Sequence, residues 1–151
     1  MAAAPAQGVP TQLSHVALRV RDVGRAVDFY TNVVGLKLRN RRENAAFLGA
    51  SEEQSHELAL FGLGDTAEGP DPKGVGMYHM AWQMASFADL EQFHDRLLTH
   101  GAKIAGYSDT SCNVMFFDPD GNELEAFWEA PKELREEARR PGGNPLPRLA
   151  R

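Results

Sequence analysis

Two segments of the chain share one pattern, in which a histidine stands at the start of a strand-like alternation of side chains. They are residues 13–20, with His15, and residues 77–84, with His79. In both, apolar residues at helical spacing follow and end at a glycine, Gly35 or Gly101. The two histidines are 64 positions apart and the two glycines are 66 apart. This pattern predicts an internal repeat with the histidines at equivalent places.

Each copy of the repeat predicts a strand, a helix and three further strands. Asp22 is suited to cap the first helix, and Ser86 followed by Asp89 forms a capping-box pattern for the second. We therefore expect an α+β fold in which two pseudo-symmetric βαβββ modules join edge to edge into one shared, curved mixed sheet, with both helices on its outer face. The expected boundaries are a disordered tail at 1–11, modules at 12–64 and 77–130, a Gly- and Pro-rich linker at 65–76, and a C-terminal helix and tail at 131–151.

Composition limits the partners of the chain. A formal net charge of −5 and a pI near 5.5 argue against nucleic acid or an anionic membrane as the main partner. No apolar run approaches the ~20 residues of a membrane-spanning helix, and the first ten residues lack the basic and apolar regions of a secretion signal. The single cysteine, Cys112, excludes an internal disulfide and suits a reducing compartment. We therefore expect a cytoplasmic protein.

Four positions meet near the axis that relates two such modules: His15, His79, Ala59 and Glu125. Alternation places each histidine on the strand face that also carries a small alanine, while bulkier neighbours face the helices. Two imidazoles and one carboxylate from three strands form the donor set typical of non-haem Fe(II) oxygenases, with other coordination positions open. Ala59 is equivalent to Glu125 and cannot bind a metal. The alternatives are that the histidines are ordinary strand residues, or that Glu123, on the same face, is the ligand.

The chain also resembles the vicinal oxygen chelate superfamily, which contains glyoxalase I, fosfomycin and bleomycin resistance proteins, and extradiol dioxygenases. The resemblance covers about residues 12–130 and implies paired βαβββ modules that form a cup around a divalent metal. Its motifs are specific for the superfamily and weak for the reaction. They are Leu13-Ser14-His15-Val16-Ala17-Leu18, Ala26-Val27-Asp28-Phe29-Tyr30, Val34-Gly35-Leu36, and Phe116-Phe117-Asp118-Pro119-Asp120-Gly121-Asn122-Glu123-Leu124-Glu125.

Within the superfamily, the segment that begins at His56 is similar to one in extradiol dioxygenases, where a histidine outside the metal's ligands acts as acid and base. The resemblance implies that role for His56; the alternative is an exposed histidine at a strand start. The absence of a ligand at Ala59 also matches the dioxygenases. Two departures count against them, because Met115 and Ser108 stand where those enzymes usually have tyrosine and histidine. Tyr107 or Asp109 is a candidate replacement on the neighbouring strand.

These features together favour a metal-dependent, extradiol-type dioxygenase that cleaves a catecholic or other vicinal-oxygen substrate. The expected ligands are His15, His79 and Glu125, holding Fe(II) in preference to Mn, Ni or Zn. The alternatives are a glyoxalase-like lyase or isomerase with another divalent metal, and a protein that sequesters a small molecule without turnover. We expect a homodimer, with the sites either within each chain or shared between two chains. His94 and His100, on the second helix, are expected to lie on the surface.

Overall fold

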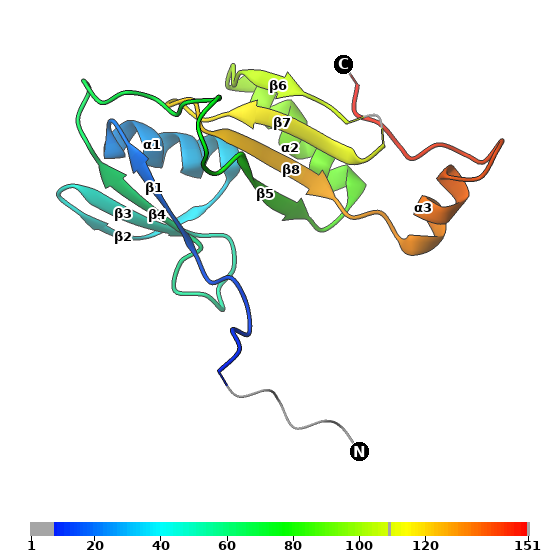
Figure 1. The fold of residues 1–151 in the computed structure, drawn as a ribbon, viewed down its shortest axis with the longest axis horizontal. Helices are drawn as coiled ribbons and strands as arrows, with labels where there is room; N and C mark the ends of the chain where they lie inside the picture. The colour runs from blue at the N-terminus through cyan, green and yellow to red at the C-terminus, as the bar shows by residue number, and fades with distance from the viewer. Residues whose placement is uncertain (1–7, 109, 151) are drawn as a thin grey trace.

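The computed structural model of the chain describes residues 8–108 and 110–150. Of the expected tail at 1–11, residues 1–7 lie outside the described part, and residues 8–11 contain no helix or strand. The chain follows the predicted order of strand, helix and three strands, twice over, and then a short helix (Figure 1). The first module consists of β1 (Val16–Val20), α1 (Val23–Phe29), a π-helical turn η1 (Tyr30–Val34), β2 (Lys37–Arg42), β3 (Ala45–Gly49) and β4 (Leu58–Gly62). The second consists of β5 (His79–Met84), α2 (Phe87–Thr99), β6 (Ile104–Gly106), β7 (Cys112–Phe117) and β8 (Glu123–Trp128), followed by α3 (Lys132–Ala138).

The strands of each module form a four-stranded mixed sheet, in the order β1-β4-β3-β2 and β5-β8-β7-β6. In each sheet the first strand runs parallel to the last, and the registers are equivalent: Ala17 pairs with Ala59, and Ala81 pairs with Glu125. The predicted α+β fold of two pseudo-symmetric modules is therefore confirmed. The prediction of one shared sheet is wrong, because among the described residues β1 and β5 do not pair with each other, and each is the edge strand of a separate sheet.

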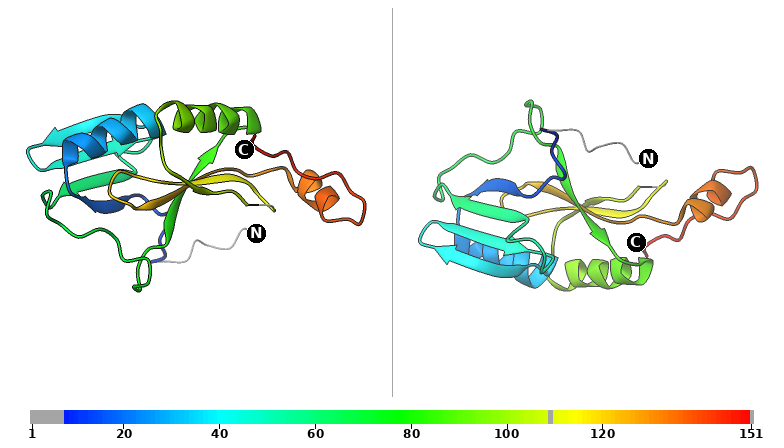
Figure 2. Two further views of the ribbon diagram at one scale, coloured as in Figure 1. Left: turned by 90° about the horizontal axis from the view of Figure 1, so that it is seen from above. Right: turned by 90° about the horizontal axis from the view of Figure 1, so that it is seen from below.

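The two main helices lie in one layer over one side of the sheets, while the linker and the N-terminal segment lie on the other side (Figure 2). Both helices begin at the predicted caps. The carboxylate of Asp22 accepts a hydrogen bond from the backbone N–H of Arg25 at 2.6 Å, and the hydroxyl of Ser86 accepts one from the N–H of Asp89 at 3.1 Å. The π-helical turn η1, which continues α1, ends at Gly35, whose φ of 92° is a left-handed conformation that favours glycine.

The core lies between the helical layer and the sheets. Alternation along β1 buries Leu18 and Val20, while Ala17 and Arg19 face away from the helices. The same alternation buries Met80 on β5 and leaves Ala81 exposed. On β1 and β5, the face turned away from the helices therefore carries small and polar side chains, as predicted.

Side chains of the first module bind a single turn of the second, residues 118–122. The hydroxyl of Tyr30 donates to the buried Asp118 at 2.9 Å. Arg21 and Arg25 both pair with the carboxylate of Asp120, at 3.0 and 2.6 Å, and the side chain of Asp120 is only 5% exposed. In the reverse direction, Arg96 on α2 donates to the carbonyl oxygens at the end of η1. These contacts fix the position of one module relative to the other.

The C-terminal segment crosses the end of the second module, where the thiol of the buried Cys112 donates to the carbonyl of Pro147 at 3.4 Å. Burial raises the pKa of this thiol, which disfavours the reactive thiolate form. Within the described residues, every helix is too short or too polar to cross a bilayer.

Candidate metal site

His79 and Glu125 lie next to each other on adjacent parallel strands, β5 and β8. The Nε2 atom of His79 is 3.1 Å from an Oε2 atom of Glu125, and both side chains are partly shielded from solvent. When two ligand atoms each lie about 2.1 Å from a metal and the ligand–metal–ligand angle is about 90°, the two ligand atoms are about 3 Å from each other. The spacing of this pair therefore fits two neighbouring ligands of one divalent cation.

The other nitrogen of His79, Nδ1, is buried without a hydrogen-bond partner among the described residues. A buried polar atom in this state is costly unless a water or an ion satisfies the group. The other oxygen of Glu125, Oε1, accepts a hydrogen bond of 2.6 Å from the side-chain amide of Asn113 on β7. Sequence reasoning missed Asn113, although its position on the strand next to β8 and its face of that strand place it near Glu125.

His15 and His56 form a second pair, on the first module. Their ring centroids are 4.7 Å apart, and Phe47 meets His56 edge-on at 5.1 Å. The Nδ1 atom of His56 is 3.1 Å from the hydroxyl of Ser55. His15 is exposed and His56 is half-buried, so both rings are accessible from the cup side.

His15 and His79 line one cavity of about 360 Å³, which opens between the unpaired edges of β1 and β5. Its other walls are largely apolar and include Trp82, whose indole N–H is buried without a partner in the described part of the chain. However, no three His, Cys, Asp or Glu side chains among the described residues come close enough to hold one metal ion. The single chain thus brings the predicted residues together as two pairs, His15 with His56 and His79 with Glu125.

The positions that bear on the choice of reaction are also well defined. Ala59 is buried, and its pairing with Ala17 makes it equivalent to Glu125, so this corner of the site carries no metal ligand. Met115 lies directly across from Glu125 in the strand register. Glu123 lies opposite His79 in the register, yet the carboxylate in contact with the imidazole is that of Glu125.

Three further polar residues can be placed. The carboxylate of Glu57 accepts hydrogen bonds from the backbone N–H groups of Ala50 and Ser51, so it stabilises a turn. His100 is exposed, as expected. The expectation that His94 lies on the surface is wrong: it is 3% exposed, because its ring packs against Tyr107 and its Nε2 atom is 2.8 Å from the tyrosine hydroxyl. Asp109, a candidate replacement for a missing catalytic group, lies outside the described residues.

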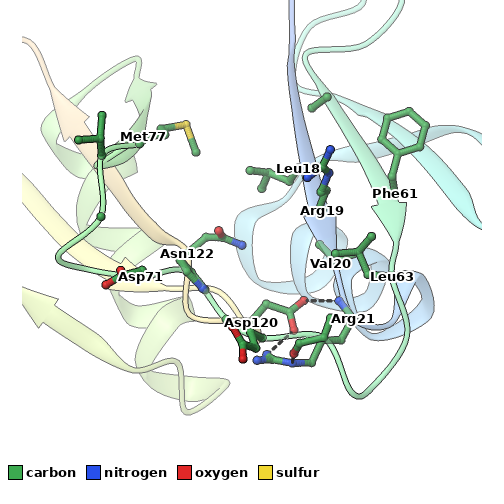
Figure 3. Close-up of a pocket in the computed structure, with 18 residues that line it drawn as sticks. Leu18, Arg19, Val20, Arg21, Phe61, Leu63, Asp71, Met77, Asp120 and Asn122 are labelled. Atoms are coloured by element: carbon green, nitrogen blue, oxygen red, sulfur yellow. Dashed lines mark hydrogen bonds and ion pairs between the residues drawn. The ribbon is translucent and has the colours of Figure 1, made fainter.

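A larger cleft of about 990 Å³ lies beside the histidine cavity, between β1, the linker and the turn at 118–122 (Figure 3). Met77 lines both spaces. The cleft contains apolar side chains, among them Phe61 and Leu63, together with Arg19, which makes no ion pair with any described residue. The acidic residues Glu68 and Asp71 also line the cleft, so Arg19 provides a local positive charge in a cleft of mixed charge.

A family model agrees with this architecture. The model of the Glyoxalase/Bleomycin resistance protein/Dioxygenase superfamily matches residues 12–126. The chain belongs to this superfamily. Among solved structures, a glyoxalase/dioxygenase from Nostoc punctiforme superposes on this superfamily member with a TM-score of 0.71 and 21% identity, over 87% of this chain and 99% of that one.

Curated relatives within the superfamily catalyse different reactions. The catechol-2,3-dioxygenase of Bacillus subtilis (strain 168) is 26% identical over 132 residues, which cover 81% of this chain and 43% of that enzyme. This superfamily member therefore spans less than half the length of that dioxygenase. The lactoylglutathione lyase of Escherichia coli O157:H7 is 29% identical over 132 residues, which cover 78% of this chain and 93% of the lyase. The relatives thus include a dioxygenase and a lyase, so the similarity supports an enzyme of this superfamily without selecting one of the two reactions.

Proposed function

We propose that the protein is a metal-dependent dioxygenase of extradiol type that cleaves the ring of a catecholic substrate. The observation that carries the proposal is the pair His79–Glu125 at 3.1 Å, together with Ala59 at the position equivalent to Glu125. A site with two imidazoles and one carboxylate leaves open positions that a chelating substrate and dioxygen require. The similarity to a catechol-2,3-dioxygenase supports the same reaction class.

The donor set fits a divalent metal, with Fe(II) preferred and Mn, Ni or Zn as alternatives. His79 and Glu125 would supply two ligands and His15 the third. When bound, the metal would serve as Lewis acid and as template for the two adjacent oxygens of the substrate. The spacing of 3.1 Å between Nε2 of His79 and Oε2 of Glu125 supports the proposal, because two neighbouring ligands of one divalent cation lie about 3 Å from each other.

His56 is the proposed acid–base residue. Its ring stacks near that of His15, so it lies beside one of the proposed ligands and is not one of them. The hydroxyl of Ser55 contacts Nδ1, which leaves Nε2 available to accept a proton from a substrate hydroxyl and to return it later. Imidazole is a side chain that can both accept and return a proton under physiological conditions.

A second copy of the chain is the proposed source of the missing third ligand. The contacts of Tyr30 and the two arginines with the turn at 118–122 oppose a rotation of the modules that would bring His15 to Glu125 within one chain. The edges of β1 and β5 are unpaired, and the apolar side chains near the histidines are exposed: Leu13 is 83% exposed and Tyr78 is 73% exposed. In a symmetric dimer that covers these edges, the same contacts occur twice. Each chain would then supply the third ligand to one of two equivalent sites.

The cleft beside the histidines suggests which catechols the site would accept. Arg19 on β1 follows His15 by four residues, so the two lie roughly 13 Å apart if the segment 15–19 is fully extended. We expect a carboxylated catechol with a side chain of this reach to have a lower KM than the uncharged analogue. The replacement Arg19→Met should remove that preference and leave the KM of the uncharged catechol unchanged.

A lyase or isomerase acting on a vicinal-oxygen substrate is the second candidate. One observation favours it: the chain covers 93% of the Escherichia coli O157:H7 lactoylglutathione lyase and only 43% of the dioxygenase. The same three residues would hold a different divalent metal in that case. A third candidate, a protein that sequesters a small molecule, would use the cleft without turnover.

The test begins with the metal. Wild-type protein is loaded anaerobically with Fe(II), its metal content is measured, and oxygen consumption is recorded with a panel of catechols. We expect one iron per site and oxygen uptake with ring-cleaved product. Iron binding without oxygen uptake on any catechol would refute the dioxygenase and favour the lyase, which is then assayed with Ni, Zn or Mn. Unchanged metal content in His79→Ala would refute the site itself.

A further inference from the structure

Asn113 is a nearly buried amide on the cup face of the second module, next to the proposed metal ligands. Its strand, β7, is the antiparallel neighbour of β8, and Asn113 pairs with Phe127 while Met115 pairs with Glu125. Asn113 and Glu125 are therefore diagonal neighbours on one sheet face, a spacing that side chains of this length can bridge. Asn113 is 8% exposed, so both ends of its amide require hydrogen-bond partners.

Both ends of the amide have such partners, and they determine its orientation. The Oδ1 atom of Asn113 accepts a hydrogen bond of 2.8 Å from the backbone N–H of Ser108. Because a backbone N–H can only donate, the oxygen must face Ser108 and the NH2 group must face Glu125. The NH2 group then donates to Oε1 of Glu125 at 2.6 Å. A reversed amide would lose both hydrogen bonds.

The opposite oxygen of the same carboxylate faces the imidazole. Oε2 of Glu125 is 3.1 Å from Nε2 of His79, while Oε1 is occupied by Asn113. The hydrogen bond thus fixes the rotation of the carboxylate and leaves one oxygen directed toward the histidine. The loop that supplies the Ser108 N–H is itself attached to the core, through the contact between Tyr107 and the buried His94.

We infer that Asn113 is a positioning residue, which holds Glu125 in the orientation needed to bind a divalent metal beside His79. The inference rests on the proposed function, because it assigns a role at the proposed metal site. Groups that orient a metal ligand through a hydrogen bond contribute about 10- to 100-fold to metal affinity. Asn113 does not touch the metal or the substrate in this role.

The test replaces Asn113 with leucine, which has a similar volume and no donor. Co(II) is titrated into the metal-free protein, and the dissociation constant is taken from the visible absorption of the bound ion. We expect Asn113→Leu to weaken Co(II) binding by about 10- to 100-fold. The matched control is Val114→Ala, on the same strand, which weakens the core on the other face. This control should bind Co(II) like the wild type.

A second measurement needs no metal. In the nuclear magnetic resonance spectrum, the side-chain amide of Asn113 should be shifted by its contact with the carboxylate, and Glu125→Ala should abolish that shift. Wild-type Co(II) affinity in Asn113→Leu, or an amide signal insensitive to Glu125→Ala, would overturn the inference. If the wild-type protein binds no Co(II), the proposed metal chemistry fails, and the amide signal alone decides whether Asn113 holds Glu125.

Discussion

Mixing two variants that we expect to be inactive tests whether the proposed metal site is shared between chains. His15→Ala removes a ligand from the first module, and Glu125→Ala removes one from the second. If each site combines the first module of one chain with the second module of its partner, a heterodimer of the two variants has one intact site and one site that lacks both ligands. Random exchange makes half of the dimers heterodimers, so about a quarter of the wild-type sites are restored. A site within one chain would give no recovery at any ratio.

The assay measures iron per chain and oxygen uptake after the two variants are denatured together and refolded. The matched control mixes His79→Ala with Glu125→Ala. Both replacements remove a proposed ligand from the second module. Every dimer in that mixture lacks a ligand at every site, so neither iron binding nor activity should return. Size measurements establish that dimers form in both mixtures. Dimers without recovery in the His15→Ala mixture, or equal recovery in the control, would refute the shared site.

Three further predictions concern single residues. Tyr30→Phe should lower the free energy of unfolding by about 1.5–3 kcal/mol in urea, because a buried hydrogen bond to the Asp118 carboxylate is lost, whereas the exposed Tyr78→Phe should cost nothing measurable. Burial, aided by Asp118, raises the pKa of Tyr30 well above 10, so the folded state retains a proton that the unfolded state loses. Wild-type stability should therefore fall as the pH rises above about 10, and the cost of Tyr30→Phe should shrink there; a constant cost would contradict this assignment. His56→Gln should lower kcat by about 10²- to 10⁴-fold with unchanged metal affinity, whereas an unchanged kcat would exclude the acid–base role. Cys112 should react with a thiol reagent far more slowly in the folded protein than in denaturant, because burial raises its pKa; equal rates would show that the thiol is accessible.

Local structure could be predicted from the sequence because its causes are local. The helix caps at Asp22 and Ser86 and the left-handed glycine at Gly35 depend on a few consecutive residues, and all three stand where predicted. The alternation of the strands also predicted which face of β1 and β5 carries the histidines. The equivalence of Ala59 and Glu125 followed from counting residues, and the strand registers agree with it.

The arrangement of the two modules could not be predicted in this way. The expectation of one shared sheet failed because the placement depends on side chains about 90 or more positions apart, such as Arg21 and Asp120. The burial of His94 likewise depends on its contact with Tyr107, which no helical pattern reveals. Asn113 was within reach of sequence reasoning, because a polar residue in a run of apolar ones, on the face of the expected carboxylate ligand, requires a partner.

The contacts between modules explain why the sequence motifs specify the superfamily and leave the reaction open. The motif at 26–30 ends with Tyr30, and the motif at 116–125 contains Asp118 and Asp120. These residues bind each other or the arginines across the module boundary, so the motifs describe how the scaffold is assembled. Glu125, at the end of the second motif, is the residue whose carboxylate lies 3.1 Å from the imidazole of His79. The positions that would select between ring cleavage and isomerisation are Ala59 and Met115. Ala59 lies outside the motifs, and Met115 immediately precedes the motif at 116–125. A motif match therefore predicts the fold and includes a ligand of the proposed metal site, while the reaction must be decided by assays at these two positions.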